Sequence, residues 1–349
     1  MKIKLIAASA ALLACSAAQA QTSVTLYGVA DIGLEYLTKV ERTDDNLLRM
    51  SSGNLSGSRW GLRGSEDLGG GLKSVFVLES GFHVDTGAGG SRLFNRQAYL
   101  GLQGKFGTLT MGRHQNLLYD FTVDFDPLGA ATRYSMSRMD ADMVSRADNS
   151  IKYTGKFGGL SAAALYSFGY NNNGEVAGQW RRGREMSGGL GYAAGPFAVS
   201  AVYDHRNPTE SSRVQRATVG GTYAVGPAKL YAGYRWAQLI EGKAGSRANL
   251  WWAGASYQAT PALTLAGAAY YQDYRRVGAD PWMFSVQADY AFSKRTDVYL
   301  STAYAMNRKA NGLTSGLSLD GELSPSLKPA TPGKKQNQFG VVVGIRHRF

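Results

Sequence analysis

Apolar and polar side chains alternate with a period of two residues along almost the whole chain. In residues 24–36 the apolar side chains lie mainly at even positions, and in residues 282–293 the even positions are again the apolar ones. In residues 339–349 the odd positions carry the apolar side chains. A helix would require apolar spacings of three and four residues. The pattern therefore predicts half-buried β-strands and argues against a mainly helical fold.

The connections between the expected strands come in two sizes. Short turns containing Gly or Pro alternate with longer polar connections, of which 117–147 is the longest internal one. This alternation predicts consecutive hairpins whose long loops lie on one rim and whose short turns lie on the other. The expected 16 strands are 23–37, 54–68, 72–84, 92–105, 107–116, 148–157, 160–170, 184–193, 197–206, 216–225, 228–239, 247–259, 262–275, 281–293, 295–308 and 337–349.

The polar face of these strands carries too many charges for the dry core of a soluble sandwich. Aromatic residues stand near polar ones towards many strand ends, as the girdles of a membrane barrel do. In lipid every backbone hydrogen-bonding group must be paired within the protein, so the sheet must close. We therefore predict an all-β fold, a 16-stranded antiparallel transmembrane β-barrel with an aqueous lumen. The charges expected to face water include Asp31, Glu35, Arg59, Arg63, Lys73, Glu79, Lys229, Arg235, Asp289 and Arg346.

The N-terminus has the three parts of a secretory signal peptide. A basic start is followed by the apolar run 5–15 and by Ala18-Gln19-Ala20, a small-x-small cleavage pattern. The expected domains are a cleaved signal peptide over 1–20 and one barrel domain over 21–349. A lipoprotein signal acylated at Cys15 is the alternative. Normal cleavage removes Cys15, which is the only cysteine, so neither disulfides nor thiolate metal sites are expected.

The charge of the mature chain bears on the class of solute. The whole chain has 38 Lys and Arg and 26 Asp and Glu, and loss of Lys2 and Lys4 with the signal leaves a net charge of +10. Export argues against a nucleic-acid partner, and the basic residues are scattered rather than clustered on one segment. This balance favours anionic solutes, or alternatively it marks no more than a basic surface.

Several segments closely resemble the general porins of Gram-negative β-proteobacteria. They are SVTLYG at 23–28, SRWGLRGSEDLGGGLK at 58–73, FVLESGF at 76–82, RQAYLGL at 96–102, FGTLTMGR at 106–113 and GIRHRF at 344–349. The resemblance implies a homotrimer in the outer membrane, in contact with its lipid and lipopolysaccharide. It also implies that the third extracellular loop, at about 117–147, folds inward as a constriction. The closing Phe349 resembles the signal read by the outer-membrane assembly machinery.

The resemblance also implies which residues form the constriction. It places Arg59, Arg96 and Arg146 on a basic wall, with Lys73 as a further candidate, and acidic loop residues opposite them. Strict alternation points Arg59 inward, but it puts Arg96 on the lipid face unless a bulge resets the phase. In the loop, the three aspartates nearest to the strand exit are the acidic candidates, namely Asp120, Asp124 and Asp126.

No catalytic or metal-binding pattern is found in the sequence. The glycine-rich stretch 189–194 fits a loose dinucleotide fingerprint, but it lies inside an expected strand with no helix after it. The four histidines are scattered, and no HExxH or GxSxG occurs. We therefore expect no enzyme and no cofactor, but a passive outer-membrane channel for small hydrophilic solutes with a preference for anions. The alternatives are a substrate-specific anion channel with a saturable site, and a surface adhesin or receptor that works through its loops.

Overall fold

The computed structural model describes residues 23–40, 45–171, 175–241, 244–275, 280–307, 317–320 and 337–349. The predicted signal peptide over 1–20, with Cys15, lies outside the described residues. In the described part of the chain, no helix is both long enough and apolar enough to cross a membrane.

The described residues form one sheet of 17 strand segments and four short helical segments. The strands are β1 (Ser23–Leu37), β2 (Leu47–Ser52), β3 (Arg59–Gly69), β4 (Leu72–Gly81), β5 (Gln97–Gly104), β6 (Gly107–Gln115), β7 (Arg146–Phe157), β8 (Leu160–Ser167), β9 (Glu185–Ala194), β10 (Phe197–Arg206), β11 (Ser212–Val225), β12 (Ala228–Glu241), β13 (Ala244–Gln258), β14 (Leu263–Tyr274), β15 (Trp282–Ala291), β16 (Thr296–Met306) and β17 (Gln338–Arg348). The helical segments are α2 (Leu117–Thr122), η1 (Val123–Phe125), α3 (Met136–Met139) and η2 (Ala141–Val144).

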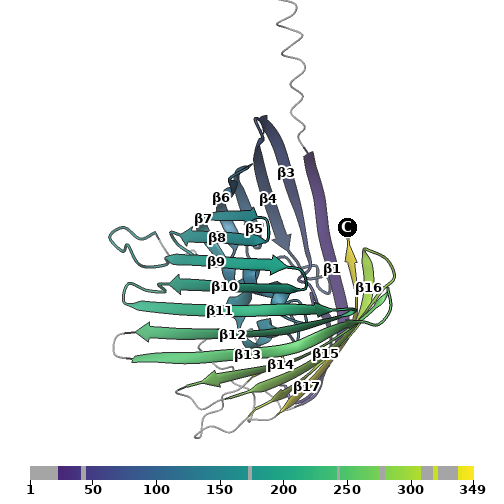
Figure 1. The fold of residues 1–349 in the computed structure, drawn as a ribbon. Helices are drawn as coiled ribbons and strands as arrows, with labels where there is room; N and C mark the ends of the chain where they lie inside the picture. Colours follow the sequence, from purple (N-terminus) through teal and green to yellow (C-terminus); the bar gives the residue numbers. More distant parts are fainter. Residues whose placement is uncertain are drawn as a thin grey trace, which may run out of the picture.

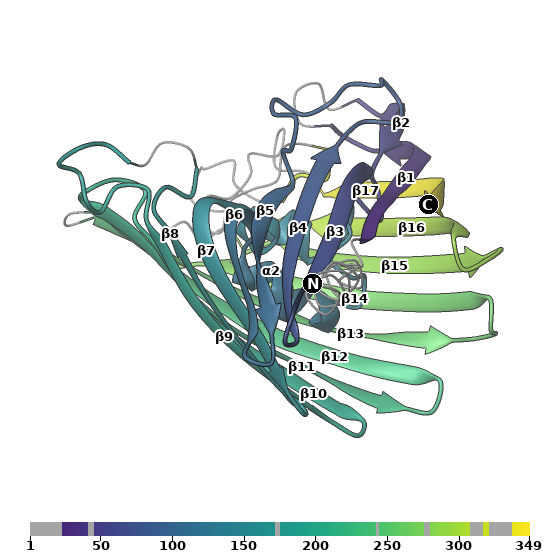
Figure 2. The same cartoon turned by 90° about the horizontal axis from the view of Figure 1, so that it is seen from above.

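The sheet closes on itself because β1 is paired along both edges. One edge of β1 pairs with β17 over Val29–Leu37, and the other pairs with β3 and then with β2, always antiparallel. Since β2 and β3 occupy successive parts of one position beside β1, the segments make a closed 16-stranded barrel. Figure 1 shows this ring from the side, with the C-terminus next to β1, and Figure 2 shows it from above. The predicted fold class is confirmed.

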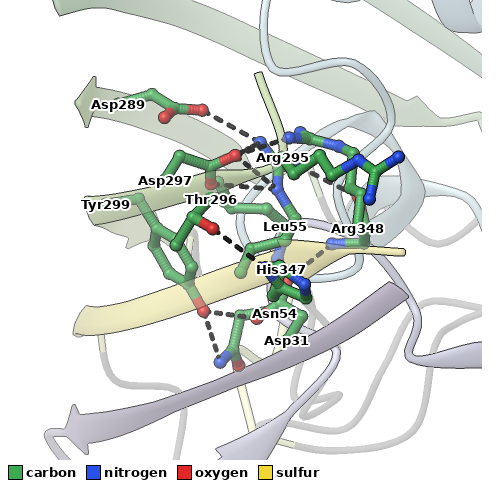
Figure 3. A network of polar contacts seen from close by, with 12 residues as sticks. Asp31, Asn54, Leu55, Asp289, Arg295, Thr296, Asp297, Tyr299, His347 and Arg348 are labelled. Atoms are coloured by element: carbon green, nitrogen blue, oxygen red, sulfur yellow. Dashed lines mark hydrogen bonds and ion pairs between the residues drawn. The ribbon is translucent and has the colours of Figure 1, made fainter. Parts of the chain in front are cut away.

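A polar network inside the barrel strengthens the seam between the first and last strands (Figure 3). Arg346 of β17 lies 3.0 Å from both Asp289 of β15 and Asp297 of β16, and Arg348 lies 2.7 Å from Asp297. The Tyr299 hydroxyl donates to Asp31 of β1. The network therefore joins four neighbouring strands across the point of closure.

The two faces of the sheet differ as the alternation predicts. On β1, Leu26 and Leu34 are exposed on the outside by 59% and 58%, whereas Asp31 and Glu35 point inward and are fully buried. An apolar outer face suits hydrocarbon, and an inner polar face suits water. Arg59, Asp289 and Arg346 all make their ion pairs on the inner face.

The second strand differs from the prediction in both its position and its continuity. Residues 38–53 were expected to be a loop, but they contain β2, and the strand expected over 54–68 begins only at Arg59. The Asp31 carboxylate accepts hydrogen bonds of 2.8 Å from the backbone N–H groups of Leu55 and Ser56, which draws residues 53–58 into the barrel. The strand is therefore interrupted because its backbone bonds to an inner carboxylate rather than to its neighbours.

The connection between β6 and β7 runs through the interior of the barrel, where Figure 2 shows α2 inside the ring. Asn116 caps α2 by accepting a hydrogen bond from the Tyr119 N–H. The segment's apolar side chains build the main buried core, which includes Leu117, Leu118, Tyr134, Met136, Met139 and Met143. This core packs against the inner wall and narrows the lumen from one side.

Candidate functional site

Two of the predicted basic residues meet on one glutamate of the strand between them. Arg96 Nε lies 2.7 Å from Glu79 Oε1, and Arg59 Nε lies 3.4 Å from Glu79 Oε2. Glu79 is placed by β4, where it stands opposite Gly61 of β3 and Gln97 of β5. The Tyr27 ring fills the space beside Gly61, and its hydroxyl donates a 3.0 Å hydrogen bond to Glu79 Oε2.

The position of Arg96 resolves the conflict with strict alternation. Arg96 shares the parity of Leu100 and Leu102, which are exposed on the outer face. Strand β5, however, begins only at Gln97, one residue later. Because Arg96 precedes the regular strand, its side chain reaches the inner Glu79 with no bulge in β5.

A second carboxylate holds two more arginines beside the first pair. Asp148 of β7 forms ion pairs with Arg113 and, at 2.8 Å, with Arg92. Neither Arg92 nor Arg113 was among the basic residues predicted for the site. Arg113 shares the outward parity of Met111, and only the register shift between Gly112 and His114 frees it to turn inward.

Arg146 lies beside these four arginines but has no carboxylate of its own. It begins β7, and its Nε is buried without a hydrogen-bond partner among the described residues. Arg96, Arg113 and Glu79 all act on it electrostatically. The arginine cluster, defined here as Arg59, Arg92, Arg96, Arg113 and Arg146, thus holds five positive charges against the two carboxylates of Glu79 and Asp148.

Lys73 does not join the arginine cluster. It lies beside the tight turn 69–71, where it pairs with Asp67 of β3 and Gln103 of β5. It is six residues from Glu79 along β4, a separation of about 20 Å at the usual rise of a strand. Its parity gives it the lumen face, but at the opposite end of the barrel.

The three predicted loop aspartates have different environments. Asp120, in α2, forms an ion pair with Lys152 of β7. Asp120 and Asp124 line an open cavity of about 520 Å³, together with Lys156 and Lys229 of the wall. Tyr119, next to Asp120, is near enough to Arg59 and Arg146 to act on both electrostatically. The start of the loop therefore lies between the arginine cluster and the lumen.

Asp126 is not a pore residue, which corrects the prediction. It is only 2% exposed, and its carboxylate accepts from the Tyr270 hydroxyl and from the backbone N–H groups of Leu128, Ala130 and Met136. Burial raises the pKa of Asp126, and these hydrogen bonds oppose that rise. The role of Asp126 is to organise the turn of the loop and to bind it to β14.

Further contacts fix the loop to the wall. Asp140 lies 2.8 Å from Arg235 of β12, and both side chains are fully buried. Asp142 lies 3.1 Å from Arg206 of β10 and 3.0 Å from Arg216 of β11. Trp252 Nε1 donates a 2.7 Å hydrogen bond to the carbonyl of Phe125. The narrow part of the lumen is consequently bounded by a loop that is held on several sides.

No group of three or more His, Cys, Asp and Glu side chains that could hold a metal ion occurs within the described ranges. His114 bonds to Ser150 and Thr110, at 2.7 and 2.9 Å, and stacks on Tyr99, so its ring is part of the wall. The stretch 189–194 lies in β9 and leads through a tight turn into β10, as expected for a chance match to the dinucleotide fingerprint.

Comparison with known proteins agrees with this geometry. A model of the Gram-negative porin family matches residues 7–310. An outer membrane porin protein of Bordetella pertussis is 32% identical over 88% of this chain and 95% of its own length. Outer membrane porin protein 32 of Delftia acidovorans is 31% identical over the full length of both chains.

Solved structures give the same result. An anion-selective porin from Comamonas acidovorans has a TM-score of 0.82 and 27% identity, covering 94% of this chain and 100% of its own. The trimer form of the outer membrane protein OmpT of Vibrio cholerae has a TM-score of 0.66 over 94% of this chain and 99% of its own, and its 18% identity bears on the fold alone. The chain therefore belongs to the Gram-negative porin family and forms a channel in the bacterial outer membrane.

Proposed function

We propose that this channel passes small hydrophilic solutes and ions by passive diffusion and prefers anions. The observation that carries the proposal is Arg146, whose guanidinium makes no ion pair with a described carboxylate while it lies close to other arginines. A mobile anion supplies the missing counter-charge. Size exclusion by the loop and the field of the arginine cluster then select together, because charges in a narrow passage are weakly screened.

The reversal potential of the channel in a planar bilayer under a KCl gradient tests this proposal. We expect a potential of the sign that chloride permeation gives, and a smaller one at high salt, where the fixed charges are screened. A potential of the opposite sign would refute the anion preference and leave the channel itself intact.

A saturable anion site is the second candidate function. Arg96 just before β5, Arg113 in β6 and Arg146 at the start of β7 lie close together, and such a group binds a multivalent anion more strongly than chloride. Conductance measured against the concentration of a dicarboxylate separates the two candidates. A plateau at low concentration favours the specific site, and a linear rise favours simple diffusion.

The proposal predicts a pH dependence through Asp120. Burial raises the pKa of Asp120, and Lys152 opposes that rise. The negative charge is therefore lost at a higher pH than that of an ordinary aspartate, and Lys152 is left uncompensated. Lowering the pH from about 7 to about 4 should increase the anion preference. Asp120→Asn should be more anion-selective at neutral pH and should respond less to acid, and an unchanged response would contradict this role.

We infer the oligomeric state, the export and the membrane contacts of the chain from its similarity to porins. The chain acts as a homotrimer surrounded by outer-membrane lipid and lipopolysaccharide, is exported by the leader 1–20, and catalyses no reaction. The trimer form of the Vibrio cholerae protein supports the first of these. Phe349 is recognised by the assembly machinery during insertion, and its backbone bonds with Gly28, at 3.0 and 3.1 Å, place it at the seam. Cross-linking of the purified protein tests the oligomeric state.

A further inference from the structure

An open cavity with a basic lining lies at the long-loop end of β9–β12, on the side of the sheet away from the lumen. Its volume is about 520 Å³, and its lining includes Arg181, Arg184, Arg213 and His205. The one carboxylate in this lining, Glu210, is used by the backbone, since it accepts 2.9 Å hydrogen bonds from the N–H groups of residues 181 and 182. None of the three guanidinium groups makes an ion pair with a described carboxylate.

A long apolar groove lies next to this cavity on the same outer face, nearer to the short-turn end of the strands. It encloses about 840 Å³ between Tyr203, Leu190 and Tyr234, with Ala201 and Ala217 as its floor. Tyr203 lies two residues before His205 on the same face of β10, and it pairs with Ala217 of β11. The basic cavity and the apolar groove are therefore neighbours on the outer face, since His205 of one and Tyr203 of the other are about 7 Å apart along β10.

The boundary between the two regions lies at the level where a headgroup meets hydrocarbon. The Tyr203 hydroxyl accepts a 2.8 Å hydrogen bond from Gln215, while its ring lines the apolar groove. Tyr203 therefore has one polar and one apolar side. The Tyr234 ring packs at a tilt against Trp251, and stacked contacts continue this aromatic row through Tyr271 to Trp282 across β12–β15. Aromatic rows of this kind mark the membrane–water interface.

We propose that this outer surface binds a phosphorylated lipid of the outer leaflet, with its phosphate among Arg181, Arg184 and Arg213 and an acyl chain in the groove below. Arginine binds phosphate through paired, charge-assisted hydrogen bonds. Bulk lipid is as apolar as the groove, so the groove alone cannot select one lipid over another. Selection must therefore come from the phosphate. The inference deepens the proposed contact with lipopolysaccharide and is independent of the anion preference of the lumen.

Native mass spectrometry of the full protein in detergent tests this site with lipid A carrying two phosphates and with the same lipid after removal of its phosphates. We expect the phosphorylated form to bind at least tenfold more tightly. The double variant Arg184→Gln/Arg213→Gln should reduce this preference to threefold or less. The matched control, Arg247→Gln/Arg275→Gln, changes one arginine in β13 and one directly after β14 and should keep this preference.

A second variant tests the groove separately from the charges. Ala217→Trp should fill the groove and weaken binding of both lipid forms at least fivefold, and inorganic phosphate should not displace the lipid from the wild type. Equal affinity of the wild type for the two lipids would overturn the proposal. So would the same preference for the phosphorylated lipid in the double variant and in its control. Displacement of the bound lipid by inorganic phosphate would also overturn it. The reversal potential of every variant should stay that of the wild type, which separates this test from that of channel selectivity.

Discussion

Arg146→Glu is expected to turn an anion-preferring channel into a cation-preferring one. The change places a negative charge at the one position of the arginine cluster whose arginine makes no ion pair with a described carboxylate. At about 5 Å in water a unit charge changes the energy of a passing ion by about 0.8 kcal/mol, so the reversal amounts to about 1.7 kcal/mol. This corresponds to more than a tenfold change in the partitioning of each ion. The reversal potential under a salt gradient measures it.

Lys294→Glu is the matched control for this experiment. It makes the same change of charge in the exposed turn between β15 and β16, outside the arginine cluster. We expect its reversal potential to stay close to that of the wild type. If the two variants shift the potential equally, the net charge of the protein decides selectivity, and the arginine cluster does not.

Asp140→Leu is expected to destabilise the barrel interior and release the constriction loop. The substitution leaves Arg235, a fully buried cation, without its partner at 2.8 Å. Breaking a buried ion pair in this way costs about 3–5 kcal/mol. Single-channel records should show frequent partial closures as the loop moves. The folded barrel should also convert to the unfolded form at a lower temperature in gel electrophoresis.

The double variant Asp140→Leu/Arg235→Leu separates the ion pair from the volume of the side chains. With both charges removed, most of the lost stability should return, because no unpaired charge stays buried. A steady single-channel record from Asp140→Leu alone would show that the other contacts of the loop, such as the Trp252 hydrogen bond to Phe125, suffice to hold it.

The sequence predicts the sidedness of the strands well and the contacts of the loop poorly. The alternation in β1 gives the inner positions of Asp31 and Glu35 correctly, since it depends only on neighbouring residues. Asp126 could not be assigned in the same way. Its environment is made by Tyr270, 144 residues away, and no local pattern indicates that partner.

The errors at the strand ends have a related cause. In the sequence, Arg96 has the same parity as the outward-facing residues of β5, but the strand begins only at the next residue, Gln97. The missed strand β2 did carry a signal, because Leu48 and Met50 alternate with Arg49 and face outward. Its short length and the polar turn after it hid that signal. Resemblance to a family, rather than periodicity, brought Arg96 and Arg146 into the predicted site.

The pairing of β1 with β17 has a consequence for how the polypeptide is made. Residues of β17 and Phe349, more than 300 positions after β1 in the sequence, supply the bonds that β1 needs along one edge. A chain cut short before β17 would expose the unpaired edge of β1 to hydrocarbon, where each backbone amide without a hydrogen-bond partner is strongly destabilising. Only chains that include β17 can close the barrel, so the architecture itself discriminates against copies that are cut short before it.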